Sequence, residues 1–285
     1  MISLVLASVG RAEEVDGLLQ SLLTQRGANF ELIVVDQNAD DRLAAPIERA
    51  RGAGLAVTHL RLAQANLSAA RNLGIEHARG DVIGFPDDDC WYEPDVVASV
   101  AAAFAAHPEW TGVVAQWVEQ AQARDGAAPA ELLSAENWRR FRDGDASSIS
   151  LFIRADALRA CGGFDARLGV GQWFGAGEET DLILALLSRG ALLARCPQAR
   201  VHHRYTGAAQ AQAAVSWRAA LRRARGTGAL YAKHRLSAWV ALRGFIAPPL
   251  KACRPWRGSH ALKLGLATSA GRLQGTLAWL LGRHR

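Results

Sequence analysis

An unbroken acidic run, Asp87-Asp88-Asp89, is the feature of this sequence best suited to chemistry. It follows an apolar segment at 82–85, which reads as a buried strand. Like charges packed together are costly unless a cation or solvent offsets them. Mg²⁺ typically takes one or two carboxylates together with substrate phosphates, so the run suits a hard divalent ion that also binds a diphosphate. Taken alone, it is equally compatible with a solvated acidic loop before a helix.

A second acidic cluster, Glu178-Glu179-Thr180-Asp181, opens a predicted helix over 178–188. One interpretation is electrostatic, because acidic residues favour helix N-termini. The functional interpretation is a general base that takes the proton of an attacking hydroxyl. Clustered carboxylates favour that role by raising one another's pKa. The glycines at 162–177 suit a loop that closes over a substrate.

Further candidates are single polar residues near the ends of predicted elements. Asp36 ends an apolar strand and can accept a hydrogen bond from a nucleobase imide, or it can form a local turn. Arg71 lies on a predicted helix, where it can reach a phosphate or simply face solvent. His202 and His203 follow the last predicted strand, where a neutral imidazole can complete a metal site or lie on the surface.

Alternating strand and helix patterns predict an α/β fold for the first 120 residues. Short apolar strands separated by amphipathic helices indicate βαβ units and a mostly parallel sheet covered on both faces. Ligands of such sheets bind outside the carboxyl ends of the strands, where Ser8, Asp36 and Asp87 fall. The predicted strands are 2–8, 31–37, 57–62, 82–87 and 111–119, and the predicted helices are 12–25, 42–52, 66–79 and 93–106. Beyond them we expect a loop at 121–130, a helix at 131–142 and strands at 147–153 and 191–196, followed by the segment 201–203.

The chain changes character near residue 210. Residues 182–285 carry 18 of the 33 Lys and Arg residues and none of the 27 Asp and Glu residues. Helices are predicted at 211–235 and 260–282, and the segment 236–250 between them contains Trp239, Phe245 and Ile246 and ends at Pro248-Pro249. Their apolar runs are too short for a span of about 20 residues, but they suit helices that lie in a membrane interface. We therefore predict a domain at 1–209 and a basic helical tail at 210–285 that associates with an anionic membrane surface. Nucleic acid is a less favoured partner, because Trp and Leu accompany the charge.

The cysteines and the N-terminus indicate the compartment. Cys90, Cys161, Cys196 and Cys253 are widely spaced, so neither a disulfide framework nor a zinc–thiolate site is expected. The first residues lack a basic region and a long apolar region, so no signal peptide is predicted. We expect a cytoplasmic protein, peripheral on the inner face of the cytoplasmic membrane.

Taken in order, these motifs resemble family 2 glycosyltransferases of GT-A fold over about residues 1–205. The matching pieces are Ser8-Val9-Gly10-Arg11, Val34-Val35-Asp36, Leu67-Ser68-Ala69-Ala70-Arg71-Asn72-Leu73-Gly74, Phe85-Pro86-Asp87-Asp88-Asp89, Gly162-Gly163-Phe164-Asp165, Gly177-Glu178-Glu179-Thr180-Asp181-Leu182 and Val201-His202-His203. No single piece is decisive, but all seven occur in the family's order.

The resemblance implies a role for each donor-site residue. Asp36 would contact the base, usually uracil, and Arg71 would lie near the nucleotide. The family's D-x-D motif falls on Asp87, near the ribose, and on Asp89, the principal ligand of Mn²⁺ or Mg²⁺. His202 or His203 would add a metal contact. Ser8, Arg11 and Asp88 complete the predicted nucleotide-sugar site.

For catalysis, the family's Glu-Asp pair aligns with Glu178-Glu179, and its second acid is commonly the base. Here that acid is Glu rather than Asp, which moves the carboxylate by one methylene and leaves Asp181 as a rival. The Gln-x-x-Arg-Trp signature of processive members is absent, which favours a single-addition enzyme.

The resemblance thus implies an inverting, metal-dependent transferase. It would move a sugar from a nucleotide-sugar donor, UDP-linked by expectation, to a hydroxyl of a saccharide or lipid-linked saccharide in bacterial surface polysaccharide or glycolipid assembly. A sugar-phosphate nucleotidyltransferase is an alternative, poorly supported by Gly10-Arg11 alone. A non-catalytic, membrane-associated nucleotide-sugar-binding protein is another.

Overall fold

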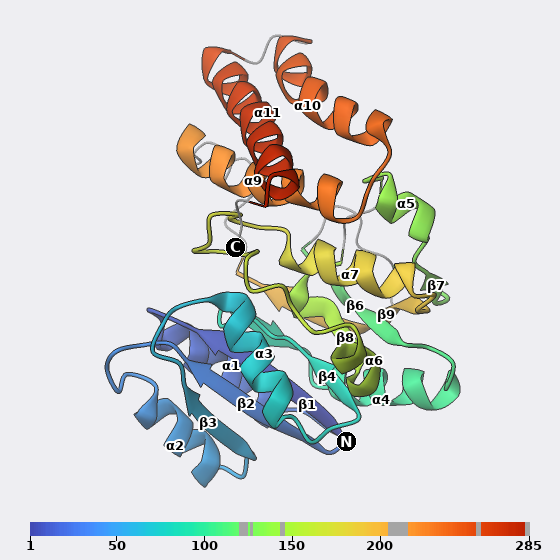
Figure 1. Ribbon diagram of the computed structural model, residues 1–285. Coiled ribbons are helices and arrows are strands. Elements are labelled where there is room, and N and C mark those ends of the chain that lie inside the picture. The colour runs from blue at the N-terminus through green and yellow to red at the C-terminus, as the bar shows by residue number, and fades with distance from the viewer. Residues whose placement is uncertain (120–124, 126–127, 143–145, 205–215, 255–257, 283–285) are drawn as a thin grey trace. The chain divides into compact units, whose positions relative to one another are not determined.

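A computed structural model describes residues 1–119, 125, 128–142, 146–204, 216–254 and 258–282 (Figure 1). The chain forms two compact units, which we call unit 1 and unit 2. Unit 1 comprises Met1–Ala135, Gly144–Gly163 and Leu186–Tyr205, and unit 2 comprises Glu136–Asp143, Phe164–Ala185 and Thr206–Arg285. Unit 2 therefore takes a segment from the middle of the chain as well as the C-terminal residues. The predicted boundary at 209/210 stays a prediction.

Unit 1 contains one sheet in the order β3-β2-β1-β4-β8-β6-β9-β5, with β7 also paired to β9. Its strands are β1 (Ile2–Ser8), β2 (Phe30–Asp36), β3 (Val57–Arg61), β4 (Val82–Gly84), β5 (Cys90–Tyr92), β6 (Gly112–Trp117), β7 (Glu131–Leu132), β8 (Leu151–Arg154) and β9 (Leu193–His203). β1 to β4 are parallel to one another, and β6 is parallel to β9. β5, β7 and β8 add the antiparallel pairs.

Helices cover both faces of the sheet because side chains alternate along each strand. Leu4 and Leu6 of β1 lie in one core with the apolar residues of α1 (Glu13–Leu23), α2 (Ala44–Gly52) and α4 (Val96–Ala106). Val5 points to the opposite face, where α3 (Leu67–His77) lies. A Cβ on Gly74 would collide with the Val5 side chain, so α3 rests directly on β1. This contact fixes the height of α3, and with it Arg71, above the sheet.

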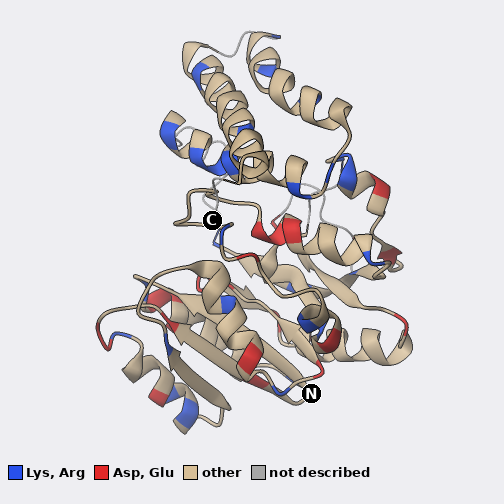
Figure 2. Ribbon diagram, in the orientation of Figure 1, with Lys and Arg blue, Asp and Glu red and all other residues tan. Residues whose placement is uncertain are grey.

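Unit 2 is mainly helical. Its helices are α5 (Ala135–Arg139), the first eight residues of α7 (Glu178–Ser188), α9 (Trp217–Lys233), α10 (Ala238–Cys253) and α11 (Ser259–Leu280). Ser216 and Ser237 cap α9 and α10 by accepting hydrogen bonds from backbone amides. A small core forms around Leu168, Phe174 and Leu230. Lys and Arg are the charged residues of α9, α10 and α11 (Figure 2).

The backbones of α9 and α11 approach each other very closely. A Cβ on Gly228 would collide with the carbonyl oxygen of Arg272, and one on Gly275 would collide with that of Arg225. Gly271 meets the carbonyl of Leu221 in the same way. Only glycine leaves room for this contact, and both helices have glycine at the contact positions.

Some elements differ from the sequence predictions. Residues 131–142 form β7 and the short α5 rather than one helix. Residues 148–150 form a 3-10 turn before β8, so only the second half of the predicted strand 147–153 is extended. β5 and α6 (Ala155–Ala160) are additions that the patterns missed. Most of the predicted loop at 121–130 lies outside the described residues.

The prediction that the apolar runs near the C-terminus are too short to span a membrane is confirmed for the described residues. Among the described helices, none combines the length and the apolar character needed to cross a membrane.

Candidate active site

The carboxyl ends of β1 and β2 meet at Ser8 and Asp36, which are register partners. Asp36 is fully buried. Its Oδ2 lies 3.0 Å from Nε2 of His59 on β3, and its Oδ1 accepts hydrogen bonds from the backbone N (2.9 Å) and Nδ2 (2.7 Å) of Asn38. Asn38 also accepts a hydrogen bond from the backbone N of Gly10 at 2.6 Å, where the chain turns with φ of 79°. Asp36 is therefore held in one orientation at the sheet edge.

The acidic run lies beside the end of β1. Asp88 accepts hydrogen bonds from Oγ of Ser8 at 2.8 Å and from Nη1 of Arg11 at 2.6 Å. The same Arg11 nitrogen lies 2.5 Å from Oδ2 of Asp89. The structure thus brings together Ser8, Arg11, Asp88 and Asp89, four of the predicted site residues.

The neighbouring carboxyls of Asp88 and Asp89 differ in acidity. Burial raises the pKa of Asp88, and the contacts with Ser8 and Arg11 offset this only in part. Burial also opposes the ionisation of Asp89, but hydrogen bonds and charge from His203 and Arg11 outweigh it and lower its pKa to about 2. Asp89 is therefore the firmly ionised member of the pair, as a principal metal ligand must be.

Arg71 is almost fully buried, at 2% exposure. Its Nη2 donates to Oγ of Ser148 at 2.8 Å and to Oδ1 of Asp87 at 3.1 Å. A buried guanidinium needs such partners, because an unpaired buried charge is very costly. The interpretation of Arg71 as a residue facing solvent is therefore wrong, and the arginine instead supports the first acid of the run.

The two histidines on β9 point in different directions. Nε2 of His203 lies 3.0 Å from Oδ1 of Asp89, and this hydrogen bond raises the pKa of His203. The ring of His202 stacks on Trp91, and its nitrogens lie 2.7 Å from Glu119 and 2.9 Å from Glu93. Successive residues of a strand alternate in direction, which explains the split. His203, and not His202, adjoins the acidic run.

These donors fit a divalent ion that is shared with a substrate. Across the described residues, no three His, Cys, Asp or Glu side chains are grouped so that they could hold a metal ion. Asp89 and His203 nevertheless place a carboxylate oxygen and an imidazole nitrogen side by side. The buried Nδ1 of His203 has no hydrogen-bond partner within the described part of the chain. Since Mg²⁺ usually completes its coordination with phosphate oxygens and water, two protein donors suffice for such a site.

The acidic cluster at the start of α7 belongs to unit 2. Oδ2 of Asp181 lies 2.7 Å from Nζ of Lys233, and its Oδ1 lies 2.7 Å from Nε2 of His234. Lys233 also contacts Asp165 at 2.6 Å. Asp181 is thus engaged in a buried ion-pair network, whereas the roles of Glu178 and Glu179 stay predictions.

Sequence reasoning missed Asn38, His59 and Ser148, which orient the predicted residues. The sequence offers one signal for His59, a histidine inside the predicted strand 57–62, but the pairing of that strand with the strand of Asp36 comes from the structure. For Ser148 the sequence offers no signal, because the pattern of 147–153 predicts an ordinary strand, whereas Ser148 lies in a 3-10 turn.

Comparison with known proteins identifies the class. The chain matches solved glycosyltransferase structures over 99% of its length at 14% sequence identity. One is S. aureus TarS 1-349 in complex with UDP-GlcNAc (TM-score 0.62, 92% of that chain). Another is the mannosyltransferase PcManGT from Pyrobaculum calidifontis in complex with GDP-Man and Mn²⁺ (TM-score 0.65, 87% of that chain). The fold is therefore the GT-A fold of glycosyltransferases, as the motifs predict.

The family follows from the sequence comparison. The family model described as glycosyl transferase family 2 matches residues 3–160, and the chain belongs to that family. It is 33% identical over 108 residues to an uncharacterized glycosyltransferase of Haemophilus influenzae, covering 38% of this chain and 36% of that protein. It is 36% identical over 96 residues to the putative glycosyltransferase EpsH of Bacillus subtilis, covering 33% and 27%. The chain thus spans only about a third of the length of these relatives, or less.

Proposed function

We propose that this chain is an inverting glycosyltransferase that moves a sugar from a nucleotide-sugar donor, UDP-linked, to an acceptor hydroxyl. The observation that carries the proposal is the convergence of Ser8, Arg11, Asp88, Asp89 and His203 at one edge of the sheet. Ligands of parallel sheets bind at this edge. Solved structures of the same fold contain UDP-GlcNAc, or GDP-Man with Mn²⁺, which supports a donor of this class.

The surroundings of the donor-site residues support the roles that we propose for them. Asp36 is held by Asn38 and His59, and a carboxylate so fixed can accept the imide N–H of uracil. Arg71 lies against Asp87 and favours negative charge nearby. Asp87, Asp89 and His203 would hold Mn²⁺ or Mg²⁺ jointly with the diphosphate. When bound, the ion offsets the charge that develops on the leaving diphosphate.

Inversion requires one displacement at the anomeric carbon. Glu179 takes the proton of the acceptor hydroxyl as its oxygen attacks C1. The bond from C1 to the diphosphate oxygen breaks, and the nucleoside diphosphate leaves with the electron pair. Asp181 is the weaker candidate for this base, because Lys233 and His234 already occupy its two oxygens.

We assign the acceptor to saccharides or lipid-linked saccharides of bacterial surface polysaccharide or glycolipid assembly. The chain would work in the cytoplasm at the inner face of the membrane. The charge of α9 to α11 and the exposed apolar side chains of α10 support this assignment. Anionic leaflets attract basic segments, and exposed apolar side chains add to that attraction.

The direct test is a panel of UDP-, GDP- and dTDP-sugars with Mn²⁺ or Mg²⁺. We expect the protein to bind one donor and hydrolyse it slowly, and Asp89→Ala to abolish both effects. Asp16→Ala is the matched control, because Asp16 lies on α1 in an ion pair with Arg49. If no donor binds, or if Asp89→Ala equals the wild type, the proposal fails. Donor binding with no turnover on any acceptor would indicate the non-catalytic alternative. The anomeric configuration of the product tests inversion.

A further inference from the structure

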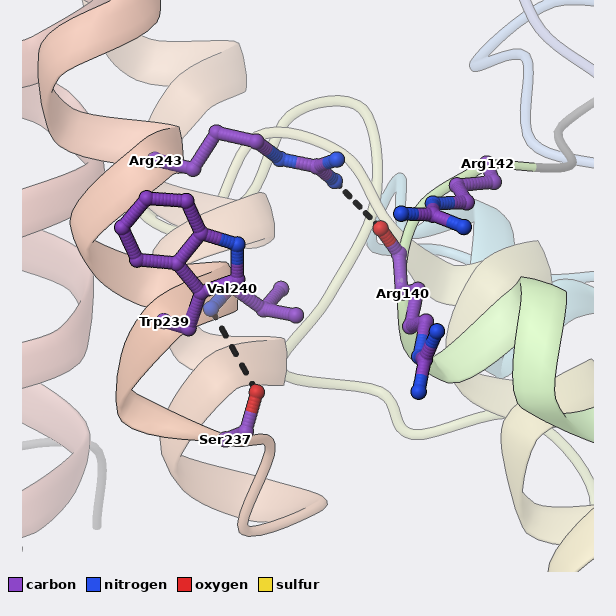
Figure 3. A pocket seen from close by; sticks show the side chains of 6 residues that line it. All are labelled: Arg140, Arg142, Ser237, Trp239, Val240 and Arg243. Carbon is purple, nitrogen blue, oxygen red and sulfur yellow. Dashed lines mark hydrogen bonds between the residues drawn. The ribbon is translucent and has the colours of Figure 1, made fainter.

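Unit 2 contains two adjoining cavities that the proposed transfer reaction does not use. The larger, of about 440 Å³, is lined by Arg243, Lys251 and Arg272 and by Phe141, Tyr231 and Val240, among others. The smaller, of about 260 Å³, lies between α10 and the residues that follow α5 (Figure 3). Arg243 and Val240 line both, so Arg243 stands where the two cavities meet.

The cavity linings contain several cations and no carboxylate. Arg243 donates to the carbonyl oxygen of Arg140, as Figure 3 shows, and Arg272 donates to that of Gly244 at 2.7 Å. Nε of Arg272 is buried and has no hydrogen-bond partner among the described residues. Neither Arg243, Lys251 nor Arg272 forms an ion pair within the part of the chain that the structure describes. Three positive charges therefore line one cavity, and no described carboxylate compensates them.

Three described carboxylates of unit 2, Glu136, Asp165 and Asp181, pair with cations that do not line the larger cavity. Glu136 pairs with Arg140 at 2.8 Å, so Arg140 is already compensated. Asp165 and Asp181 are held by Lys233. No Asp or Glu follows Asp181 in the sequence. Arg142 lines only the smaller cavity. The cations of the larger cavity are Arg243, Lys251 and Arg272.

The larger cavity also offers a neutral hydrogen-bond donor. Tyr231 is 5% exposed, and its hydroxyl makes no hydrogen bond to the described residues. Burial raises the pKa of Tyr231, although the charges of Arg272 and Arg243 oppose the rise. The phenol therefore keeps its proton at neutral pH and can donate to an anion. Its ring packs edge-on against Phe141 and Phe245, which fixes its position.

An apolar stripe on α10 runs beside these cations. Trp239, Leu242, Ile246 and Leu250 follow one another at helical spacing and are each 46–68% exposed. Arg243 and Lys251 directly follow two of them in sequence. Helices with basic and apolar faces lie in the membrane interface with the apolar residues among the acyl chains. The stripe therefore indicates where the hydrocarbon part of a ligand would lie.

We propose that the larger cavity binds the phosphate monoester or diphosphate headgroup of a membrane lipid whose chains lie along the α10 stripe. This lipid site rests on the membrane association proposed above, for which it supplies a specific ligand and the residues that bind it. A phosphate monoester carries about −1.5 to −2 charges at pH 7, as a terminal phosphate does on a modified side chain. A phosphodiester carries a single charge and would leave most of the three cations uncompensated. The site should therefore prefer the monoester or diphosphate to ordinary diester phospholipids.

Vesicle flotation with the full chain tests this preference. Phosphatidylcholine vesicles would carry either phosphatidate, a monoester, or phosphatidylglycerol, a diester, at matched surface charge. We expect roughly tenfold tighter binding to phosphatidate, the effect of one strong charge-assisted contact. Lys251→Gln and Arg243→Gln should bring the ratio of the two affinities close to one.

Arg223→Gln is the matched control, because Arg223 is an exposed residue of α9 that lines neither cavity. Each basic residue near an anionic surface contributes about 1 kcal/mol, roughly fivefold in affinity, so all three variants should weaken binding to every anionic vesicle. Arg223→Gln should nevertheless keep the preference for phosphatidate. Lys251 is exposed, so its variant also guards against unfolding of the Arg243 variant.

The outcomes separate the two proposals. If the wild type binds no anionic vesicle, membrane association and the lipid site both fail, while donor binding in the sugar panel is unaffected. If it binds phosphatidate and phosphatidylglycerol equally, or if the cavity variants keep the preference, membrane association stands and the lipid site is overturned. If millimolar inorganic diphosphate raises the melting temperature through Arg243 and Lys251 and vesicles show no preference, the ligand is a free phosphate compound, which also overturns the lipid.

Discussion

The two units of this chain compensate their charges in opposite ways. In unit 1 two acids have partners within the unit: Arg11 and His203 contact the half-buried Asp89, and His59 and Asn38 contact the fully buried Asp36. In unit 2 the cations Arg243, Lys251 and Arg272 meet no carboxylate among the described residues. A site whose charged side chains have partners of opposite charge keeps a fixed geometry before its ligand binds. A site whose cations have no such partner gains its main electrostatic stabilisation only when an anion binds.

A substitution of Glu179 tests this comparison most strongly, because Glu179 is an acid of unit 2 to which we assign the role of general base. Glu179→Gln removes the proposed base and should lower the transfer rate about 10³-fold, within the range for general base catalysis. Donor affinity should stay within about twofold of wild type, because the substitution leaves unit 1 unchanged. Steady-state kinetics and donor titration measure the two quantities. A variant with full activity would remove Glu179 from the mechanism.

Asp181 should behave as a structural acid, the exception in unit 2 that is matched from within. Asp181→Ala leaves Lys233 and His234 without their buried partner and should destabilise the protein by about 3 kcal/mol. Urea unfolding measures the change. Glu136→Ala, which breaks an exposed pair on α5, should cost less than about 0.5 kcal/mol. If Asp181→Ala is as stable as Glu136→Ala but inactive, Asp181 is the base after all.

The ion pairs of Asp165 with Arg167 and Lys233 make the stability of unit 2 dependent on pH. Burial opposes its ionisation, but Arg167 and Lys233 outweigh burial and hold its pKa well below the usual range. Because the folded pKa is depressed, the stabilisation is present above the unfolded value of about 4 and is lost as the pH falls below it. Asp165→Asn should therefore lose about 2 kcal/mol at pH 7 and less at pH 3. Denaturant titrations at the two pH values would contradict this if the gap stayed constant.

A substitution of Arg11 tests the charge compensation of unit 1. Its guanidinium bridges Asp88 and Asp89, so a divalent ion must compete with a cation of the chain. The side chain is 43% exposed, so its ion pairs are worth at most about 1 kcal/mol. Arg11→Gln should therefore bind Mn²⁺ about fivefold more tightly in calorimetry. Unchanged or weaker binding would show that Arg11 does not compete with the ion.

The sequence could predict the first half of the sheet and the residues at its edge. Unbroken apolar segments such as 32–35 identify strands that are buried on both faces, and polar residues that end them must lie at the sheet edge. The choice between His202 and His203 was beyond this reasoning. It depends on pairing with β5, a three-residue strand with too few residues to show a pattern.

The partners of Asp181 were equally beyond sequence reasoning. Lys233 and His234 lie more than 50 residues further along the chain, at the end of α9. The neighbouring sequence does not distinguish an acid that caps its own helix from an acid that forms an ion pair with a second helix. The sequence pattern therefore offers three candidates for the proposed base, Glu178, Glu179 and Asp181, and the ion pairs of Asp181 count against that residue.

The close contact of α9 with α11 has a consequence for how the protein is made. Gly228 and Gly275 seat the two helices on each other's backbones, yet α11 leaves the ribosome well after α9. The segment 164–185, with Asp165 and Asp181, must likewise wait for Lys233. The sheet can begin to assemble during translation, because domains tend to fold as they emerge. The helix that carries Glu179 gains this anchor only once the chain has been synthesised beyond residue 234.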